Sequence, residues 1–452
     1  MFDWKIIAQK AFTIVAAVIG TGCFVGHCHA DEVSLIKQGQ PIACVVADSR
    51  NTTAAGAALL DEAARWLVES LQSASGVALP VLAEADDRPA LVIARADAWP
   101  EIAKVAELKS TGFDDYTIST QADQQRIYVL GNSESAARHG VADLLRRWGF
   151  RWFAPSPKWH VTPRIQDLSV DLNVTETPRL IERRIWYAYG MSGDDLKPLM
   201  QDYQRWAAAN RLTLQGLTRT GHSYGNIISR NQEAFAANPE LSALLPDGTR
   251  DTQRSPNARK FCCSNPRLIE LVAEDRRQLL ETDRRSIPEA FMVSVDPSDG
   301  EGTCHCAECA RLGTTTDRVF HLANEVAKRL RKDDPRAWVG LYAYSSHRMP
   351  PTIDVEPNVY VQVAMGFNRT PYSLPELVER WSQRVHAIGL REYYGVEAWD
   401  WGLPGRARGG RVDYHRTWIP FYADRKLNGI NAETNANWGA QALGLYVASQ
   451  LM

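Results

Sequence analysis

The segment 293–309 (VSVDPSDGEGTCHCAEC) gathers side chains that could do chemistry. Three carboxylates, Asp296, Asp299 and Glu301, lie among prolines and glycines directly after the apolar run Phe291–Val295. Such a run has the pattern of a short buried strand, and the loops after strands carry the reactive groups of α/β barrels. Cleavage of a glycosidic bond requires two carboxyl groups across that bond. We therefore predict that this loop supplies one of them.

The same three carboxylates also fit roles without catalysis. They could cap the following helix and accept hydrogen bonds from loop amides. The oxygen-rich stretch DPSDGEG could instead hold a calcium ion, although it lacks the full twelve-residue calcium-loop pattern. The sequence leaves these alternatives open.

Cysteines end the segment in a C-x-C-x-x-C pattern. Cys304, Cys306 and Cys309 supply three thiols, and Cys262 or Cys263 could supply a fourth. Four thiolates suit structural zinc, whereas the same set suits one or two disulfides in an exported protein. The spacing matches no standard zinc-ribbon or thioredoxin pattern, so we favour disulfide bracing, with zinc at Cys262, Cys304, Cys306 and Cys309 as the weaker alternative. We expect no cofactor.

Polar and aromatic residues also follow other predicted strands. Glu397 and Glu433 are the candidates for the second catalytic carboxylate, beside Glu301. Rings stack on the apolar faces of sugars, while acids and amides bind hydroxyl groups. The candidate substrate ligands chosen on this basis are His222, Tyr224, Asp296, Asp299, Tyr344, Trp399, Asn435 and Trp438.

Several of these candidates have structural alternatives. Glu397 could pair with Arg408 or Arg411 instead of acting on substrate. Trp399 could pack in the core, and His222 could pack within its loop. Cys44 lies in an apolar run and is expected to be a buried free thiol.

The elements that position these residues alternate from residue 181 onward between short apolar runs and amphipathic segments, as in a β/α repeat. The predicted strands are Arg184–Ala188, Leu212–Leu217, Lys260–Cys263, Phe291–Val295, Trp338–Tyr344, Val359–Ala364, Glu392–Val396 and Gly429–Glu433. The predicted helices are Leu196–Ala209, Pro266–Glu281, Asp317–Arg331, Leu374–Ile388, Tyr414–Asp424 and Gly439–Leu451. About eight β/α units over residues 176–452 predict a (β/α)8 TIM-like barrel, in which 260–263 is the least regular strand.

Residues 31–175 predict a separate small α/β domain. The predicted strands are Ile42–Val46, Ala90–Ala94, Asp115–Ser119 and Arg126–Leu130, of which the last two form a hairpin. The predicted helices are Ala54–Ser73 and Ser133–Trp148, the second capped by Asn132 or Ser133. The expected fold class is therefore α/β, with this small domain followed by the barrel.

The first thirty residues have the pattern of an export signal. Lys5 and Lys10 precede an apolar run over residues 11–26, and a small-residue cleavage point follows at Ala30. We expect export to the periplasm or beyond, with no membrane span in the mature chain, because no later segment is apolar for long enough. The net charge of -2 gives no indication of a nucleic-acid partner, and the sequence does not indicate an oligomeric state.

Several stretches resemble a bacterial secreted family related to the family 67 alpha-glucuronidases and, more distantly, to the family 20 hexosaminidases. YTIST with RIYVLGNSESAARHGVADLLRRWGFRWFAP resembles the small N-terminal domain of those enzymes. SVDPSDGEGTCHCAECARLG, DRVFHLANEVAKRL, FCCSNP and NAETNANWG carry the remainder of the resemblance. The resemblance implies that Glu301 is the general acid and that Glu397 or Glu433 is the base. The adjacent Asp-Glu pair of family 20 enzymes is missing after the fourth predicted strand.

These observations together predict a glycoside hydrolase acting on a polysaccharide or oligosaccharide, with an acidic sugar as one expected product. Arg183, Arg184 or Arg369 could bind the carboxylate of such a sugar. The alternative from another class is a non-catalytic carbohydrate-binding or cell-surface protein on the same scaffold. A third is a metal-dependent or redox protein built on the cysteines.

Overall fold

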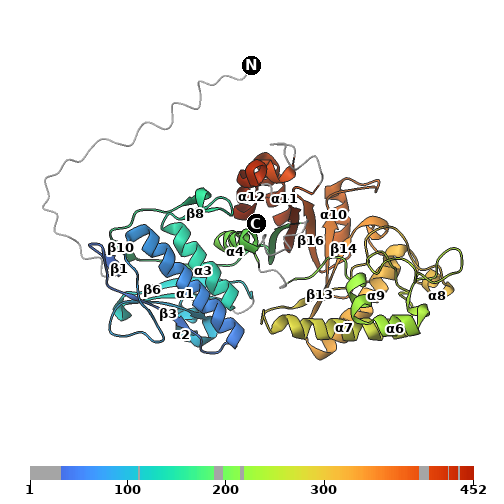
Figure 1. Ribbon diagram of the computed structural model, residues 1–452, viewed down its shortest axis with the longest axis horizontal. Coiled ribbons are helices and arrows are strands. Elements are labelled where there is room, and N and C mark those ends of the chain that lie inside the picture. Colours follow the sequence, from blue (N-terminus) through green and yellow to red (C-terminus); the bar gives the residue numbers. More distant parts are fainter. Residues whose placement is uncertain are drawn as a thin grey trace, which may run out of the picture.

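Two large sheets organise the chain in a computed structural model (Figure 1). The structure describes residues 32–109, 112–187, 197–213, 218–396, 407–425, 427–435 and 438–452. A mixed sheet forms the N-terminal part, and a parallel sheet forms the C-terminal part.

The N-terminal sheet has six strands in the order β11-β6-β7-β5-β3-β4. They are β3 (Cys44–Asp48), β4 (Val81–Leu82), β5 (Ala90–Arg95), β6 (Tyr116–Gln121), β7 (Arg126–Gly131) and β11 (Asn173–Glu176). β6 and β7 pair antiparallel, which confirms the predicted hairpin. Smaller sheets contain β1 (Val33–Lys37), β2 (Gln40–Pro41) and β10 (Leu168–Val170), and β8 (Arg151–Trp152) with β9 (His160–Val161).

Helices cover both faces of this sheet. α1 (Ala54–Ser75) and α3 (Glu134–Arg147) pack on one face through a shared apolar core, and α2 (Pro100–Val105) packs on the other. The side chain of Ser133 accepts a hydrogen bond from the backbone N–H of Ala136, so Ser133 is the predicted cap of α3. Gly76 ends α1 in a left-handed conformation with φ of 79°, which glycine adopts without strain.

The C-terminal sheet has six parallel strands in the order β12-β17-β16-β15-β14-β13. They are β12 (Glu182–Tyr187), β13 (Met292–Ser294), β14 (Trp338–Ala343), β15 (Val359–Ala364), β16 (Ala387–Tyr393) and β17 (Gly429–Thr434). The first strand therefore lies beside the last, as barrel closure requires. The predicted α/β class with a barrel-like parallel sheet is confirmed.

Helices lie outside this sheet and share one continuous apolar core with it (Figure 1). They are α4 (Lys197–Ala209), α5 (Tyr224–Arg230), α6 (Gln232–Ala237), α7 (Pro266–Arg284), α8 (Ala307–Arg311), α9 (Thr315–Asp333), α10 (Leu374–Ser382), α11 (Val412–Ala423) and α12 (Trp438–Leu451). Thr314 and Asp317 begin α9 with a reciprocal capping box, which fixes where the helix starts after the cysteine loop.

Two predicted strands differ from the structure. In the segment 260–263, Phe261 forms only an isolated antiparallel bridge with Ser242, so the predicted third strand is wrong. The predicted seventh strand begins at Ala387 rather than Glu392, because α10 already ends at Ser382. Residues 387–390 are buried in register between β15 and β17, and a strand buried on both faces shows no alternation by which to recognise it. Most of the predicted second strand, residues 214–217, lies outside the described residues.

An irregular segment, residues 218–223, lies along the open edge of β13. The side chain of Ser294 donates to the carbonyl of Gly221 over 2.5 Å, and the N–H of Ser223 donates to the carbonyl of Asp296 over 3.0 Å. Arg276 from α7 donates to the carbonyl of Ser294 over 2.8 Å. Side chains and loop backbone thus satisfy an edge that a strand would otherwise pair.

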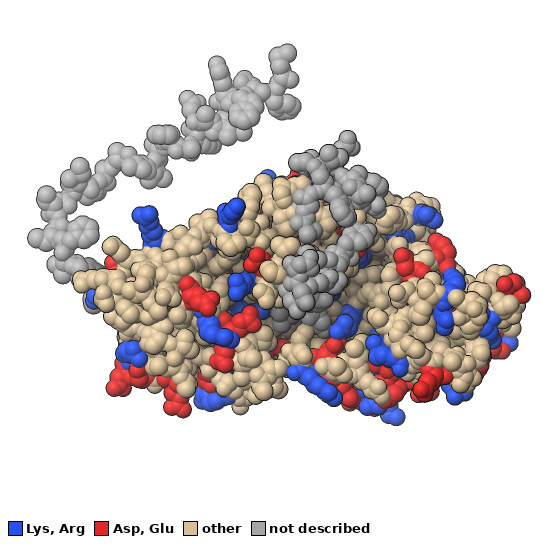
Figure 2. Space-filling view, viewed as in Figure 1, with Lys and Arg blue, Asp and Glu red and all other residues tan. Residues whose placement is uncertain are grey.

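Acidic and basic side chains are mixed over the face shown in Figure 2, which agrees with the small net charge. Among the described helices, none is both long enough and apolar enough to cross a membrane.

Candidate active site

A cavity of about 350 Å³ lies beside the parallel sheet, between its strands, the segment 218–223 and the helices α5 and α7. Because alternate residues of a barrel strand point inward, β12 contributes Arg184 and Trp186, and β17 contributes Asn431. Tyr342 from β14 and His222 from the irregular segment complete this wall. The volume lies in the range of small-molecule sites and can hold a sugar residue.

Asp296 is the buried acid at the end of β13. Its side chain accepts a hydrogen bond from the backbone N–H of Tyr342 over 2.8 Å, and Nε2 of His347 lies 3.6 Å away. Nδ1 of His222 lies 2.7 Å from Asp296 Oδ2 and 2.6 Å from the carbonyl oxygen of Pro297. Asp296 is thus held between two imidazole rings.

The pKa values of His222 and Asp296 move apart. Burial would lower the pKa of His222, but the hydrogen bond and the negative charge of Asp296 outweigh it and raise that pKa above 6.5. Burial would raise the pKa of Asp296, but His222 and His347 lower it below 3.8. Asp296 is therefore an ionised anchor for His222, and an ionised buried carboxylate is poorly suited to donate a proton.

A buried lysine holds the loop that follows Asp296. Nζ of Lys260 donates to three successive backbone carbonyls, those of Ser298, Asp299 and Gly300, the last two over 3.1 and 2.8 Å. Burial lowers the pKa of Lys260 to about 8. Lys260 thereby fixes the path of the backbone that carries the other two carboxylates.

Asp299 and Glu301 are both exposed on this loop. Oδ1 of Asp299 lies 3.8 Å from Nε2 of His222. Tyr344 is half-buried beside them, and burial together with the charge of Asp299 raises its pKa. The loop thus brings Asp299, His222 and Tyr344 together, and Glu301 follows Asp299 by two residues on the exposed part of the loop.

Glu433 at the end of β17 forms an ion pair with Arg391 of β16. The guanidinium of Arg391 lies 5.0 Å from the ring centre of Trp186, 4.8 Å from that of Tyr393 and 5.4 Å from that of Tyr342. The ring centre of Tyr342 is also 5.8 Å from that of His222. Tyr342 therefore lies between the two charged pairs of the site.

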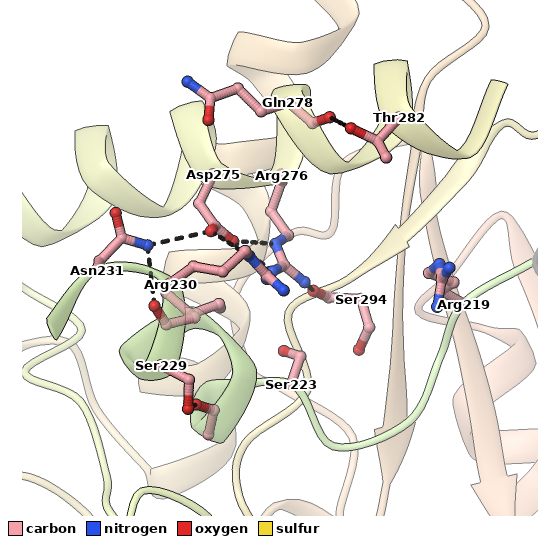
Figure 3. Close-up of polar contacts among 12 residues, drawn as sticks. Arg219, Ser223, Ser229, Arg230, Asn231, Asp275, Arg276, Gln278, Thr282 and Ser294 are labelled. Carbon is pink, nitrogen blue, oxygen red and sulfur yellow. Dashed lines mark hydrogen bonds and ion pairs between the residues drawn. The ribbon is translucent and has the colours of Figure 1, made fainter. Parts of the chain in front are cut away.

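Four arginines line the cavity and form its basic wall: Arg184, Arg219, Arg230 and Arg276. Figure 3 shows three of them beside Ser223 and Ser294. Arg219 is bound by Asp283, while Arg230 and Arg276 share Asp275. Four guanidinium groups face two carboxylates, so this wall carries excess positive charge.

The remaining predicted ligands lie apart from this cavity. Tyr224 is buried and stacks on Phe261 at 3.8 Å between ring centres. Asn435 is buried and donates to the carbonyl of Gly395 over 2.5 Å. Trp438 donates to the hydroxyl of Tyr187 and packs on Trp206. These three contribute to packing, and Glu397 and Trp399 lie outside the described residues.

The lining residues Trp186, Tyr342 and Asn431 were not predicted, and neither was Arg391, the partner of Glu433. Arg391 was missed because the expected strand began one residue after it, at Glu392. A strand begun at Ala387 would have placed Arg391 and Tyr393 on the same face two residues apart.

The favoured disulfide is not found, since all six cysteines in the described part of the chain are free. Cys44 is fully buried, as predicted.

Comparison with solved structures identifies the fold. A family GH115 4-O-methyl-alpha-glucuronidase with specificity for decorated arabinogalactans is similar over 93% of this chain, with a TM-score of 0.56 and 11% identity. The chain spans only 57% of that enzyme's length. A mutant Streptomyces plicatus beta-hexosaminidase is similar over 92% of this chain and 87% of its own, with a TM-score of 0.47 and 14% identity.

The fold is a barrel-like α/β fold with an N-terminal α/β part, and it is similar to the fold of the GH115 enzyme. Residues 154–452, well over half of the chain, match the family described as "Domain of unknown function (DUF4838)", and the chain belongs to that family. No match is found among curated protein sequences. The two solved structures above are not described as family 67 enzymes, so the finer resemblance to that family stays a prediction.

Proposed function

We propose that the protein hydrolyses a glycosidic bond of an oligosaccharide or polysaccharide and prefers an acidic sugar. The observation that carries the proposal is the placement of two carboxylate centres around Tyr342. His222 with Asp296 and the neighbouring loop lie on one side, and Glu433 with Arg391 lies on the other. Glycoside hydrolysis needs a proton donor and a second carboxylate across the bond.

Glu433 is the residue we assign as base or nucleophile. Its ion pair with Arg391 stabilises an anionic side chain, which suits a carboxylate that activates water or attacks the sugar. The rings of Trp186 and Tyr393 around Arg391 add surfaces on which a sugar can stack.

The proton donor in this proposal comes from the exposed loop. Glu301 is the residue that the family resemblance favours, and Asp299 is the one that lies beside His222. Asp296 is the anchor of His222 rather than the acid, because its lowered pKa keeps it ionised. Glu397 stays a second candidate for the base.

The preference for an acidic sugar is supported by the arginine wall. Guanidinium groups bind carboxylates with two parallel hydrogen bonds, and the four arginines exceed their two aspartate partners. Arg184 points into the cavity from β12 beside Trp186, where it can meet a sugar carboxylate.

Export of the protein is part of the same proposal. The leader-like pattern of residues 1–30 supports it, and an exported hydrolase would meet polysaccharide outside the cytoplasm.

A screen of aryl glycosides, aryl uronosides and polysaccharides tests the proposed activity. Wild type is compared with Glu301→Gln, Asp299→Asn and Glu433→Gln, and with Glu379→Gln on the exposed face of α10 as the matched control. We expect the control to retain activity, Glu433→Gln to lose it, and one of the two loop variants to lose it. Full activity in all three site variants would overturn the assignment.

Carbohydrate binding without catalysis is the second candidate. The observation in its favour is that Asp296 lies against His222 and Glu433 is paired with Arg391, so both of these carboxylates are already engaged by neighbouring side chains. Calorimetry with the same glycans separates the two candidates. Tight binding of a glycan, with no turnover of any substrate in the screen, would favour the binding protein.

A further inference from the structure

Four cysteine side chains converge beside the loop of the candidate active site. The Sγ atoms of Cys262, Cys304, Cys306 and Cys309 all lie within 4.8 Å of one another. Those of Cys262 and Cys306 are 3.6 Å apart, and those of Cys262 and Cys309 are 3.9 Å apart. Zinc–sulfur bonds of about 2.3 Å in a tetrahedron place the sulfurs about 3.8 Å apart. We propose that these four cysteines hold a structural zinc ion.

Two segments of backbone build the quartet. Cys262 lies shortly before α7, and Cys304, Cys306 and Cys309 lie in the stretch that leads from the loop after β13 into α8; α7 and α8 are labelled in Figure 1. Cys306 is the N-cap of α8, and its sulfur accepts a hydrogen bond from the N–H of Cys309 over 3.4 Å. The short helix therefore aims two of the thiols at the same point.

Hydrogen bonds to the sulfurs favour the thiolate form that a metal requires. The N–H of Leu244 donates to Cys304 Sγ over 3.2 Å, and Ser264 Oγ lies 3.1 Å from Cys309 Sγ. Second-shell donors of this kind orient ligands in metal sites. Arg318 donates to the carbonyl of Cys304 over 2.8 Å. Four thiolates with one Zn²⁺ have a net charge of −2, so the nearby guanidinium would partly balance the charge of the site.

The site is closed. Cys262, Cys304 and Cys309 are buried, and Cys306 is half-buried against the apolar core. With four protein ligands no position is left for water or substrate, which is the arrangement of a structural zinc rather than a catalytic one. All four thiols are free, and one zinc ion would engage all four at once.

Zinc at this site would brace the loop that carries Asp299 and Glu301. Lys260 lies two residues before Cys262 and donates to the carbonyls of Ser298, Asp299 and Gly300. A metal ion bound by both Cys262 and Cys304 would therefore hold the loop in addition to the hydrogen bonds from Lys260. Metal binding at the quartet would order the loop without any direct part in catalysis.

Cys263 is the natural control. It is adjacent to Cys262 in sequence and equally buried, but its sulfur lies 4.0 Å from the hydroxyl of Tyr224, outside the quartet. Cys263→Ser should keep the metal, while Cys304→Ser and Cys309→Ser should lose it.

Metal analysis of the purified protein by mass spectrometry is the experiment. We expect about one zinc per chain in wild type and in Cys263→Ser, and its loss in Cys304→Ser and Cys309→Ser. Should the serine variants fail to fold, measurements on the wild-type protein alone test the proposal. After removal of zinc and addition of Co²⁺, it should show the intense visible absorption of tetrahedral cobalt thiolate.

Three results would overturn the proposal. The first is wild type without zinc and with four alkylatable thiols, and the second is disulfide-linked peptides joining these cysteines. The third is iron in place of zinc. None of them bears on the proposed glycosidase activity, because the readout is the metal and not turnover.

Discussion

Nδ1 of His222 lies 2.7 Å from Oδ2 of Asp296, and the pair joins the irregular segment 218–223 to the end of β13. This contact crosses the part of the barrel where β13 has a loop rather than a strand as its neighbour. It therefore contributes to barrel closure as well as to the electrostatics of the site.

The His222–Asp296 pair predicts how stability depends on pH. The pKa of His222 is raised, so its stabilisation is full below 6.5 and is lost as the pH rises through the raised value. The pKa of Asp296 is lowered, so its stabilisation is present above 3.8 and is lost as the pH falls through the lowered value. The pair stabilises the fold most between these two limits.

His222→Asn should therefore lower Tm clearly at pH 6, and the difference from wild type should shrink by pH 9. Thermal melts across this range measure it, with His386→Asn on the exposed surface as the control. A Tm difference that stays constant with pH would show that His222 carries no extra proton beside Asp296.

Arg391 and Glu433 should behave as a buried pair. Their side chains are 5% and 13% exposed, so removal of one partner leaves a poorly solvated charge. We expect Arg391→Met to lower the free energy of unfolding by about 3 kcal/mol. The double variant that combines Arg391→Met with Glu433→Gln should recover part of this loss. Urea denaturation measures both.

The exposed pair of Arg277 and Glu274 on α7 provides the comparison for Arg391 and Glu433. Arg277→Met should cost less than about 1 kcal/mol, as is usual for surface ion pairs. Equal losses at the two sites would show that Arg391 is effectively solvated.

The sequence predicted most of the C-terminal strands because each is a short apolar run between polar segments. Val359–Ala364 matches β15 residue for residue, and Gly429–Glu433 misses β17 by one. The strand predicted at 260–263 is wrong because its apolar residues, Phe261 and the two cysteines, are buried by loop packing and not by strand pairing. An apolar run alone does not distinguish these two environments.

The candidate site was predicted only in part for a related reason. Asp296, Asp299 and His222 could be proposed because their segments contain several reactive residues close in sequence. Arg391 is a single charge within an apolar strand, and its partner Glu433 is 42 positions away. The grouping of Cys262 with the three later cysteines was proposed from the sequence as the weaker alternative, whereas the choice between Cys262 and Cys263 depends on the direction of each side chain, which spacing does not encode.

Lys260 predicts a local effect on the active-site loop. Lys260→Met removes three hydrogen bonds to the carbonyls of residues 298–300, so we expect faster hydrogen exchange over residues 298–302 and reduced activity. Lys328→Met on the exposed face of α9 should change neither. Unchanged exchange in Lys260→Met would show that the loop holds its path without the lysine.

Gly389 predicts a defined clash in the barrel interior. A Cβ atom at this position would lie 1.9 Å from the hydroxyl oxygen of Tyr360, which donates to Glu182 over 2.9 Å. Gly389→Ala should destabilise the fold by about 1–3 kcal/mol through overpacking. Tyr360→Phe removes the clashing oxygen, so the double variant should be less destabilised than the sum of the single variants. Strict additivity in a double-mutant cycle would contradict the clash.

Arg184 predicts substrate preference within the proposed function. Arg219 and Arg230 are each held by an aspartate through two hydrogen bonds, whereas Arg184 faces the cavity beside Trp186. If Arg184 binds a sugar carboxylate, Arg184→Met should raise KM for a uronoside by about tenfold, the loss of one charge-assisted hydrogen bond. KM for the matching neutral glycoside should not change, because that substrate has no carboxylate. Arg285→Met on the exposed surface is the control, and equal effects of Arg184→Met on both substrates would assign Arg184 to the scaffold.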